Sequence, residues 1–187
     1  SALAHYNTVL IYHINYVEAY ISRGNIYQNQ GQFEAAIADY TKALEWWHDD
    51  AQLHLVRGHT YQLKGRYDLA IVDFTKAIAI DPHNARAYRM RGVAYALTQE
   101  DALALEDFGK AVAINPNDAD IYVERGNFYL NREQYAQAVA NYQQALGINP
   151  DYLYVYDQRG RVYLKWKKYP LALIDYNNIL QRDVSYR

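Results

Sequence analysis

The chain has 187 residues, of which 51% are hydrophobic and 21% charged, and its formal net charge is −2. A charge this close to zero argues against a nucleic-acid-binding protein, because such proteins usually present a basic surface. The chain contains no cysteine, which excludes disulfides and cysteine-based metal sites or nucleophiles.

The first predicted element is a helix over residues 2–14. Ala2, Tyr6 and Val9 follow one another at steps of four and three residues, which line one face of a helix. We interpret this segment as the second helix of a helix pair whose first helix is absent. The chain is then expected to be cut from a longer array of such pairs.

A complete pair of helices is predicted from residue 17. Tyr20, Gly24 and Tyr27 lie on one face of its first helix. A turn follows at Gly31-Gln32, because glycine punctuates regular structure. The second helix repeats the spacing of the leading segment, with Ala36, Tyr40 and Ala43 on one face.

This pair recurs along the chain without an insertion. The Arg-Gly dipeptide returns every 34 residues, and each glycine is followed by a tyrosine after three residues, an alanine after twelve and an aromatic residue after sixteen. A glycine inside a helix costs roughly 1 kcal/mol relative to alanine, so its repeated presence indicates that the two helices must approach closely there. The dipeptides begin at Arg23, Arg57, Arg91, Arg125 and Arg159.

These units resemble tetratricopeptide repeats, which share the 34-residue period and the order of small, aromatic and proline positions. The resemblance covers residues 17–184 and implies an all-α, right-handed α-solenoid of antiparallel helix pairs. His54, at an aromatic position, and His48, at a proline position, are two of the departures from the pattern. We expect a partial repeat over residues 1–16 and full repeats over residues 17–50, 51–84, 85–118, 119–152 and 153–187.

The resemblance also places a concave, peptide-binding groove along the first helices. Positions that never vary are expected to serve the architecture, whereas exposed positions that vary are free to bind a protein or peptide. The apolar residues of the groove would supply contact area. Arg89 and Arg161 would orient a carboxylate of the ligand, and Asn127 would hydrogen-bond a peptide backbone. The candidate residues are Asn25, Leu55, His59, Arg86, Arg89, Val93, Val123, Asn127, Leu130, Asp157 and Arg161.

Some relatives hold a C-terminal carboxylate with a clamp of lysine, asparagine and arginine side chains. Only Asn25 and Arg89 match that clamp, since Ile21, His59 and Val93 occupy its other positions. A chaperone-type clamp is therefore disfavoured. A weaker contact to an anion through Arg86 and Arg89 stays open.

The repeated arginines have two interpretations. An acidic position is nearly as regular as the arginine position, which favours a structural ladder of ion pairs over a basic surface for a ligand. We expect most guanidinium groups to reach a carboxylate or amide of that position. The ladder would pair Arg23, Arg57, Arg91, Arg125 and Arg159 with Asp39, Asp73, Asp107, Asn141 and Asp175.

The sequence shows no sign of catalysis. The histidines lack metal-binding spacing and no glycine-rich phosphate loop occurs, so we expect no enzyme activity, no metal and no cofactor. Of the adjacent Trp46 and Trp47, one is expected in the core and Trp47 could anchor a partner, because tryptophan is enriched at binding hot spots.

The most favoured function is a protein–protein interaction scaffold, with a protein or peptide as partner and no nucleic acid. An alternative is self-assembly into a homo-oligomer through the unpaired terminal helices, because Leu3, Leu10, Ile11 and Ile14 cannot all pack on the first repeat. A regulatory fragment of a larger protein is a third interpretation. No apolar run approaches the roughly 18 residues of a membrane span. The absence of cysteine fits the cytosol as well as the periplasm, so the compartment stays open, with the cytoplasm slightly favoured.

Overall fold

The computed structural model describes residues 2–12 and 16–182, and in this part of the chain every regular element is a helix. The all-α fold predicted from the repeat pattern is confirmed. Ile14 and Val184 lie outside the described residues. In chain order the helices are α1 (Ala2–Tyr12), α2 (Val17–Asn29), α3 (Phe33–Trp46), α4 (Ala51–Leu63), α5 (Tyr67–Ile80), α6 (Ala85–Leu97), α7 (Asp101–Ile114), α8 (Ala119–Asn131), α9 (Tyr135–Ile148), α10 (Leu153–Lys165) and α11 (Tyr169–Arg182).

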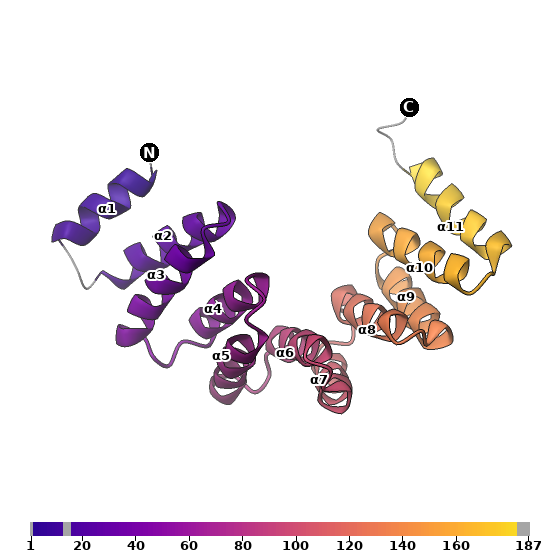
Figure 1. The fold of residues 1–187 in the computed structure, drawn as a ribbon, viewed down its shortest axis with the longest axis horizontal. Helices are drawn as coiled ribbons and strands as arrows, with labels where there is room; N and C mark the ends of the chain where they lie inside the picture. The colour runs from indigo at the N-terminus through magenta and orange to yellow at the C-terminus, as the bar shows by residue number, and fades with distance from the viewer. Residues whose placement is uncertain (1, 13–15, 183–187) are drawn as a thin grey trace. The chain divides into compact units, whose positions relative to one another are not determined.

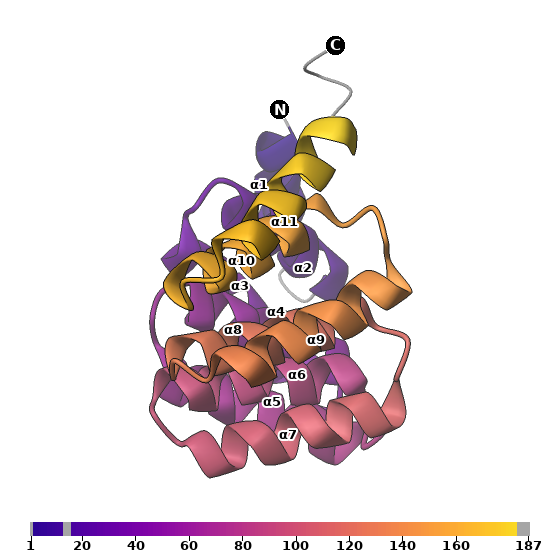
Figure 2. The same ribbon diagram turned by 90° about the vertical axis from the view of Figure 1, so that its right-hand side faces the viewer.

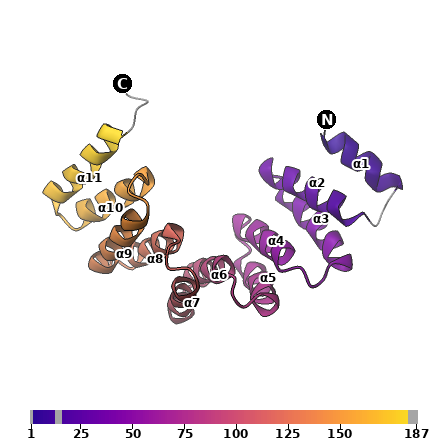
Figure 3. The same ribbon diagram turned by 180° about the vertical axis from the view of Figure 1, so that it is seen from behind.

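The chain forms two compact units, Ser1–Asp107 and Phe108–Arg187, and the boundary falls within α7. In unit 1, α2 pairs with α3, α4 pairs with α5, and α1 lies along α2 (Figures 1 and 3). In unit 2, α8 pairs with α9 and α10 with α11 (Figure 2). Each unit is therefore built from helix hairpins that pack on the next hairpin through first and second helices.

The turn inside each hairpin has the same backbone geometry. The residue after the C-cap adopts a positive φ, for example 73° at Gly31 and 57° at Glu133. The next amide reaches back five residues to a carbonyl, with 2.9 Å from Gln32 to Tyr27. These are the marks of a Schellman motif, which satisfies the free carbonyls at a helix end. Glycine adopts this conformation freely, whereas Gln99, Glu133 and Lys167 adopt it with some strain.

A glycine–aromatic contact sets the separation of the paired helices. A Cβ atom placed on Gly58 would lie 2.8 Å from a ring carbon of Phe74, which is fully buried. The equivalent Cβ on Gly126 would lie 2.7 Å from Tyr142, also fully buried. Because a buried ring has no space to retreat into, only glycine permits the helices to come this close.

Bidentate ion pairs join the same helices beside that contact. Arg57 donates from Nε to Asp73 Oδ2 at 2.8 Å and from Nη2 to Oδ1 at 2.7 Å. Arg23 and Arg91 pair in the same way with Asp39 and Asp107, and Arg159 with Asp175. In the fourth repeat Arg125 donates from Nε to the amide oxygen of Asn141 at 2.6 Å.

The arginines of unit 1 also reach the preceding second helix. Nη1 of Arg57 donates to Thr41 Oγ1 at 3.0 Å, and Nη1 of Arg91 donates to Thr75 Oγ1 at the same distance. Arg23 likewise donates to Asn7 of α1 at 2.8 Å. One guanidinium thus connects three helices, two of its own repeat and one of the repeat before it, which supports a structural role for this position.

The carboxylate of Asp73 shows the electrostatic consequence. Burial alone would raise the pKa of Asp73, but hydrogen bonds from Arg57 and His54 outweigh burial, and the pKa lies below its usual value. The ionised form is therefore favoured in the folded state. A carboxyl group of this kind stabilises the fold above its unfolded pKa of about 3.9, and that stabilisation is lost as the pH falls through the folded pKa.

Two glycine-to-alanine substitutions should change stability in opposite directions. Gly58→Ala should reduce the free energy of unfolding by about 1–3 kcal/mol, because the added methyl group overlaps the buried ring of Phe74. Gly109→Ala should raise it by about 0.5–1 kcal/mol, because Gly109 lies in α7 with open space around its Cβ position. Urea unfolding followed by circular dichroism measures both. Equal effects of the two substitutions would contradict the packing role of Gly58.

Asp73→Asn should destabilise the chain in a pH-dependent way. The substitution introduces the residue that the fourth repeat carries at Asn141, so it preserves shape and removes charge. At pH 7 we expect a loss of about 3 kcal/mol, because Arg57 and His54 then face a neutral amide. The difference from the parent should shrink towards pH 3, because below the unfolded pKa of about 3.9 the unfolded parent takes up a proton at Asp73 and the lowered folded pKa no longer favours the fold as strongly. Urea unfolding at both pH values tests this, and an unchanged difference would refute it.

Candidate functional site

In unit 1 the first helices α2, α4 and α6 carry a polar surface, which we call the first-helix face: Gln28, His59, Arg86, Arg89 and Val93. Gln28 of α2 donates to Thr60 of α4 at 2.8 Å, and its amide nitrogen lies 3.5 Å from Nδ1 of His59. The positions of the face are half-buried, apart from Arg86, which is exposed. The amide contact joins two successive repeats and orients the imidazole of His59.

The cations of this face differ from the arginines of the ladder. Arg86 and Arg89 form no ion pair with any described residue, whereas each ladder arginine has a carboxylate or amide partner. Nε of Arg89 is buried without a hydrogen-bond acceptor, and Oε1 of Gln62 is buried without a donor. A buried polar group without a hydrogen bond costs about 1–3 kcal/mol of stability. The guanidinium of Arg89 therefore has a donor that an added acceptor would satisfy.

The pKa of His59 reflects the positive charge of the first-helix face. Burial lowers the pKa of His59, and the charges of Arg86 and Arg89 lower it further. The imidazole is consequently neutral at pH 7, and its Nδ1 lone pair can accept the hydrogen bond from Gln28. An arrangement of two unpaired guanidinium groups beside a neutral imidazole is suited to an anion, above all a carboxylate.

Asn25 and Asn127 have a structural partner that the sequence analysis missed. The hydroxyl of Tyr40 donates to Asn25 at 2.7 Å, and that of Tyr142 donates to Asn127 at 2.7 Å. Burial and the charge of Asp39 raise the pKa of Tyr40 to about 12, so its hydroxyl keeps its proton. Where the second helix carries phenylalanine, the matching position holds His59 or Val93. The sequence therefore already showed that asparagine on the first helix accompanies tyrosine on the second helix of the same repeat.

The expected exposure of two apolar candidates is wrong. Leu55 is 0% exposed and Val123 is 4% exposed, and both belong to the core. Their helices bury this position against neighbouring helices, so neither side chain can contact a ligand. Val93 and Leu130 are half-buried, and Leu130 packs against the core of unit 2.

In unit 2 the charged candidates are already paired. Nε of Arg161 lies 2.8 Å from Asp157 Oδ2, one helical turn away on α10. Gln158 also donates to this carboxylate, at 3.3 Å. Arg161 was expected to orient a ligand carboxylate, but it has one within its own helix. An exposed pair of this kind adds little stability, and it leaves less charge for a partner.

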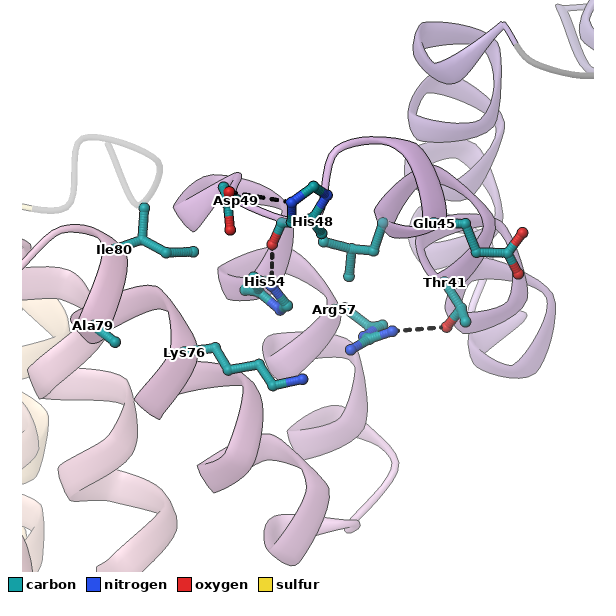
Figure 4. A pocket seen from close by; sticks show the side chains of 10 residues that line it. Thr41, Glu45, His48, Asp49, His54, Arg57, Lys76, Ala79 and Ile80 are labelled. Atoms are coloured by element: carbon teal, nitrogen blue, oxygen red, sulfur yellow. Dashed lines mark hydrogen bonds and ion pairs between the residues drawn. The ribbon is translucent and has the colours of Figure 1, made fainter.

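A hollow of about 480 Å³ opens in unit 1 where α3, α4 and α5 meet (Figure 4). His54 lies at this hollow and is only 5% exposed. Its Nε2 is 3.0 Å from the carbonyl oxygen of His48, and its Nδ1 is 3.1 Å from Asp73. The lining residues are Thr41, Leu44, Glu45, His48, Asp49, His54, Arg57, Lys76, Ala79 and Ile80.

The tryptophan pair beside this hollow corrects a further expectation. Neither indole is in the core, because Trp46 is 55% exposed and Trp47 is 42% exposed. They line a smaller hollow of about 270 Å³ that shares His48 and Asp49 with the larger one. The α3 helix ends at Trp46, so the second indole falls on the connector rather than on the packed face.

The leading helix α1 buries some of its apolar side chains and exposes others. Leu10 packs with the core of unit 1, whereas Ile11 is 76% exposed. Ile14 lies outside the described residues. Self-association through α1 therefore stays a prediction.

Among the described helices none has the length and apolarity needed to cross a membrane. The same residues contain no cluster of histidine and carboxylate side chains arranged for a metal ion.

Solved structures share this fold. The structure of MamA superposes with a TM-score of 0.71 at 25% identity, over 89% of this chain and 91% of that one. YrrB, described as a tetratricopeptide repeat protein with an unusual peptide-binding site, gives 0.64 at 22% identity over 95% and 92%. A repeat protein from Parabacteroides merdae gives 0.83 at 18% identity over 96% and 72%.

Sequence comparison identifies the family. No curated protein sequence matches the chain significantly. The tetratricopeptide repeat model matches residues 17–45, 51–84 and 119–152, which make up just over half of the chain. The matched segments hold the glycine–aromatic contacts of Gly24, Gly58 and Gly126 that set the helix separation. With its 34-residue period, helix hairpins and family match, the chain belongs to the tetratricopeptide repeat family.

Proposed function

We propose that this chain is a protein–protein interaction scaffold whose first-helix face in unit 1 binds an acidic segment of its partner. The tetratricopeptide fold in general supports such scaffolds. The observation that carries the proposal is the unpaired state of Arg86 and Arg89 among the described residues. Every ladder arginine has a partner within the fold, so these two are not needed for the same structural purpose.

The partner group best suited to this face is a carboxylate. A guanidinium can donate two parallel hydrogen bonds to it, and Nε is one of the donors in that fork. Nε of Arg89 is buried and lacks an acceptor, so a carboxylate that drew the guanidinium outward would replace an unsatisfied donor by a charge-assisted bond. Val93 adds half-buried apolar area beside the charges, which suits a peptide with mixed chemistry.

The candidates of unit 2 have a smaller part in this proposal. Asn127 is engaged by the Tyr142 hydroxyl, and Arg161 is paired with Asp157. A ligand on that unit would have to compete with these internal bonds. We therefore assign the acidic contact to unit 1.

Removing Arg89 should weaken partner binding without harming the fold. Arg89→Ala should cost roughly 1.5–3 kcal/mol of binding, which is a ten-fold or larger loss of affinity. Arg89→Lys should recover only part of it, because an ammonium lacks the planar fork. The measurement is calorimetry with an acidic peptide selected on the intact chain from a random display library.

Arg161→Ala is the matched control, since its guanidinium already has a partner in Asp157. This variant should bind within about two-fold of the parent, because loss of an exposed pair has little energetic effect. Equal affinity of the parent and Arg89→Ala would remove the basis of the proposal. Full recovery by Arg89→Lys would contradict the two-bond guanidinium contact and show that positive charge alone holds the carboxylate.

Binding of a carboxylate should also raise the pKa of His59. In the free chain the two arginines favour the neutral imidazole, and a bound anion offsets their charge. The protonated form then becomes easier to reach, so the chain should take up protons on binding near the pKa of His59. A titration of the His59 ring signals by nuclear magnetic resonance, with and without peptide, measures the shift. A pKa that stays constant or falls would place the carboxylate elsewhere.

A further inference from the structure

The second helix of the fifth repeat, α11, exposes side chains at positions that are buried one repeat earlier. Leu173 is 62% exposed and Leu180 is 61% exposed, and Asn177 between them is also exposed. In α9, on which α10 packs, the equivalent Val139 and Leu146 are buried. We call Leu173, Asn177 and Leu180 the stacking row, because their positions are those on which this fold stacks the first helix of the next hairpin.

A second exposed apolar position of α11 lies outside this row. Ile174 is 56% exposed, and its equivalent in α5, Val72, is 51% exposed although α6 packs on α5. A hairpin stacked on the helix therefore leaves this position open. The apolar surface of α11 thus has one part that stacking would cover and another part that it would not cover.

The residues of the stacking row recur at the equivalent positions of α1. Leu3, Asn7 and Leu10 lie five 34-residue periods before Leu173, Asn177 and Leu180. In α1 they hold the helix against α2: Leu10 is buried in the core of unit 1, and Leu3 is half-buried. Oδ1 of Asn7 accepts a hydrogen bond from Nη1 of Arg23 at 2.8 Å. The stacking row of α11 therefore offers the same groups that α1 uses to pack on α2.

The surface of α2 that receives α1 is of the same type as the surface of α10 that receives α9. Tyr20 of α2 packs in one core cluster with Leu10. Its equivalent in α10, Tyr156, packs in one core cluster with Leu146 of α9. A stacking row and the face of a first helix are thus complementary in both units, and α2 presents the complement of the row on α11.

The two helices that carry this row differ in how firmly they are held. In α3, Ala36 and Tyr40 are fully buried in the hairpin that α3 forms with α2. The equivalent Ala2 and Tyr6 of α1 are exposed and half-buried, because α1 has no first helix of its own among the described residues. A bidentate ion pair fastens α11 to α10, so the row on α11 lies on a complete hairpin.

We propose that α1 is an internal cap on α2, and that α11 of a second copy of this chain stacks on α2 when α1 is displaced. The leucines of the stacking row would replace Leu3 and Leu10, and Asn177 would accept the hydrogen bond from Arg23. Copies would join head to tail, because the two surfaces belong to different units of the chain. The covalent connection gives α1 a local concentration in the millimolar range, so the cap restrains association.

Sedimentation velocity of the full chain over a concentration series tests the cap. Leu10→Asp places a charge in the core contact of α1 and should release the helix. This variant should therefore associate at concentrations roughly ten-fold lower than the parent, since an open α2 surface no longer competes with α1. Leu10→Ala removes contact area without adding charge, and its association should lie between that of Leu10→Asp and the parent.

The stacking row is tested by a second substitution in the Leu10→Asp chain. Leu180→Asp should return this chain to a monomer, because the new carboxylate would be buried against apolar groups at the junction. Ile174→Asp is the matched control, since it adds the same charge to the same helix at a similarly exposed position. It should leave association within about two-fold, because stacking does not bury this position.

Mixing two chains tests the direction of the contact. The double variant Leu10→Asp, Leu180→Asp has an open α2 surface and a blocked stacking row. The parent has an intact row and a capped α2. An equimolar mixture should therefore form a dimer with one copy of each chain and no larger species.

Three results would overturn the proposal. The first is a monomer for both Leu10→Asp and Leu10→Ala at every concentration. The second is an equal effect of Leu180→Asp and Ile174→Asp. The third is tighter association of the parent than of Leu10→Asp, which would make α1 itself the contact between copies. The sedimenting mass reads the contact between copies and peptide affinity reads the first-helix face, so either proposal can fail without the other.

Discussion

The close contact between a helical glycine and a buried aromatic ring is the constraint on which the hairpins depend. Gly24, Gly58 and Gly126 leave no room for a methyl group, and the opposing rings are fully buried. Because the paired helices lie this near to each other, a bidentate arginine–carboxylate bond can form between them. The ion pair in turn extends to the preceding second helix in unit 1. Helix separation, hairpin register and repeat stacking thus follow from one steric requirement.

The arginines of unit 1 belong to two physical classes. Those that follow the 34-residue period are saturated, since each has a carboxylate partner and a further acceptor on a neighbouring helix. Arg86 and Arg89 stand outside that period and have no ion-pair partner in the described part of the chain. An arginine with all its partners fixes the alignment of the paired helices, and its replacement would leave a buried carboxylate unpaired. An arginine without an ion-pair partner can bind a ligand at little cost to the fold. Position in the repeat therefore separates architecture from recognition.

Two surfaces of unit 1, the first-helix face and the hollow beside His54, arise where a repeat departs from its own pattern. On the first-helix face, arginine occupies a position that is buried leucine or valine in other repeats, Leu55 and Val123. At the hollow, a small imidazole occupies a tyrosine position. Beside it, Trp46 ends α3 where later repeats carry isoleucine, and Trp47 begins a connector that in later repeats is an Asp-Pro or Asn-Pro turn. In each case the arginine contacts that recur in every repeat of unit 1, together with the glycine contacts of Gly24 and Gly58, maintain the fold. The departure then changes local charge or volume without removing the glycine contact.

The fold of this protein follows from its sequence alone, because the same helix pair recurs five times and the fixed glycine, alanine and aromatic positions specify how the helices pack. The sequence also indicated the arginine partners, since complementary charges recur sixteen residues apart. Which of the variable positions are exposed depends on how neighbouring helices pack, and a single helix pattern does not specify this. Leu55 and Val123 share a helical position with Arg89 and Asp157, yet neighbouring helices bury the first two. The hollow beside His54 likewise depends on side chains from three helices, and a local pattern carries no information about the space that remains between them.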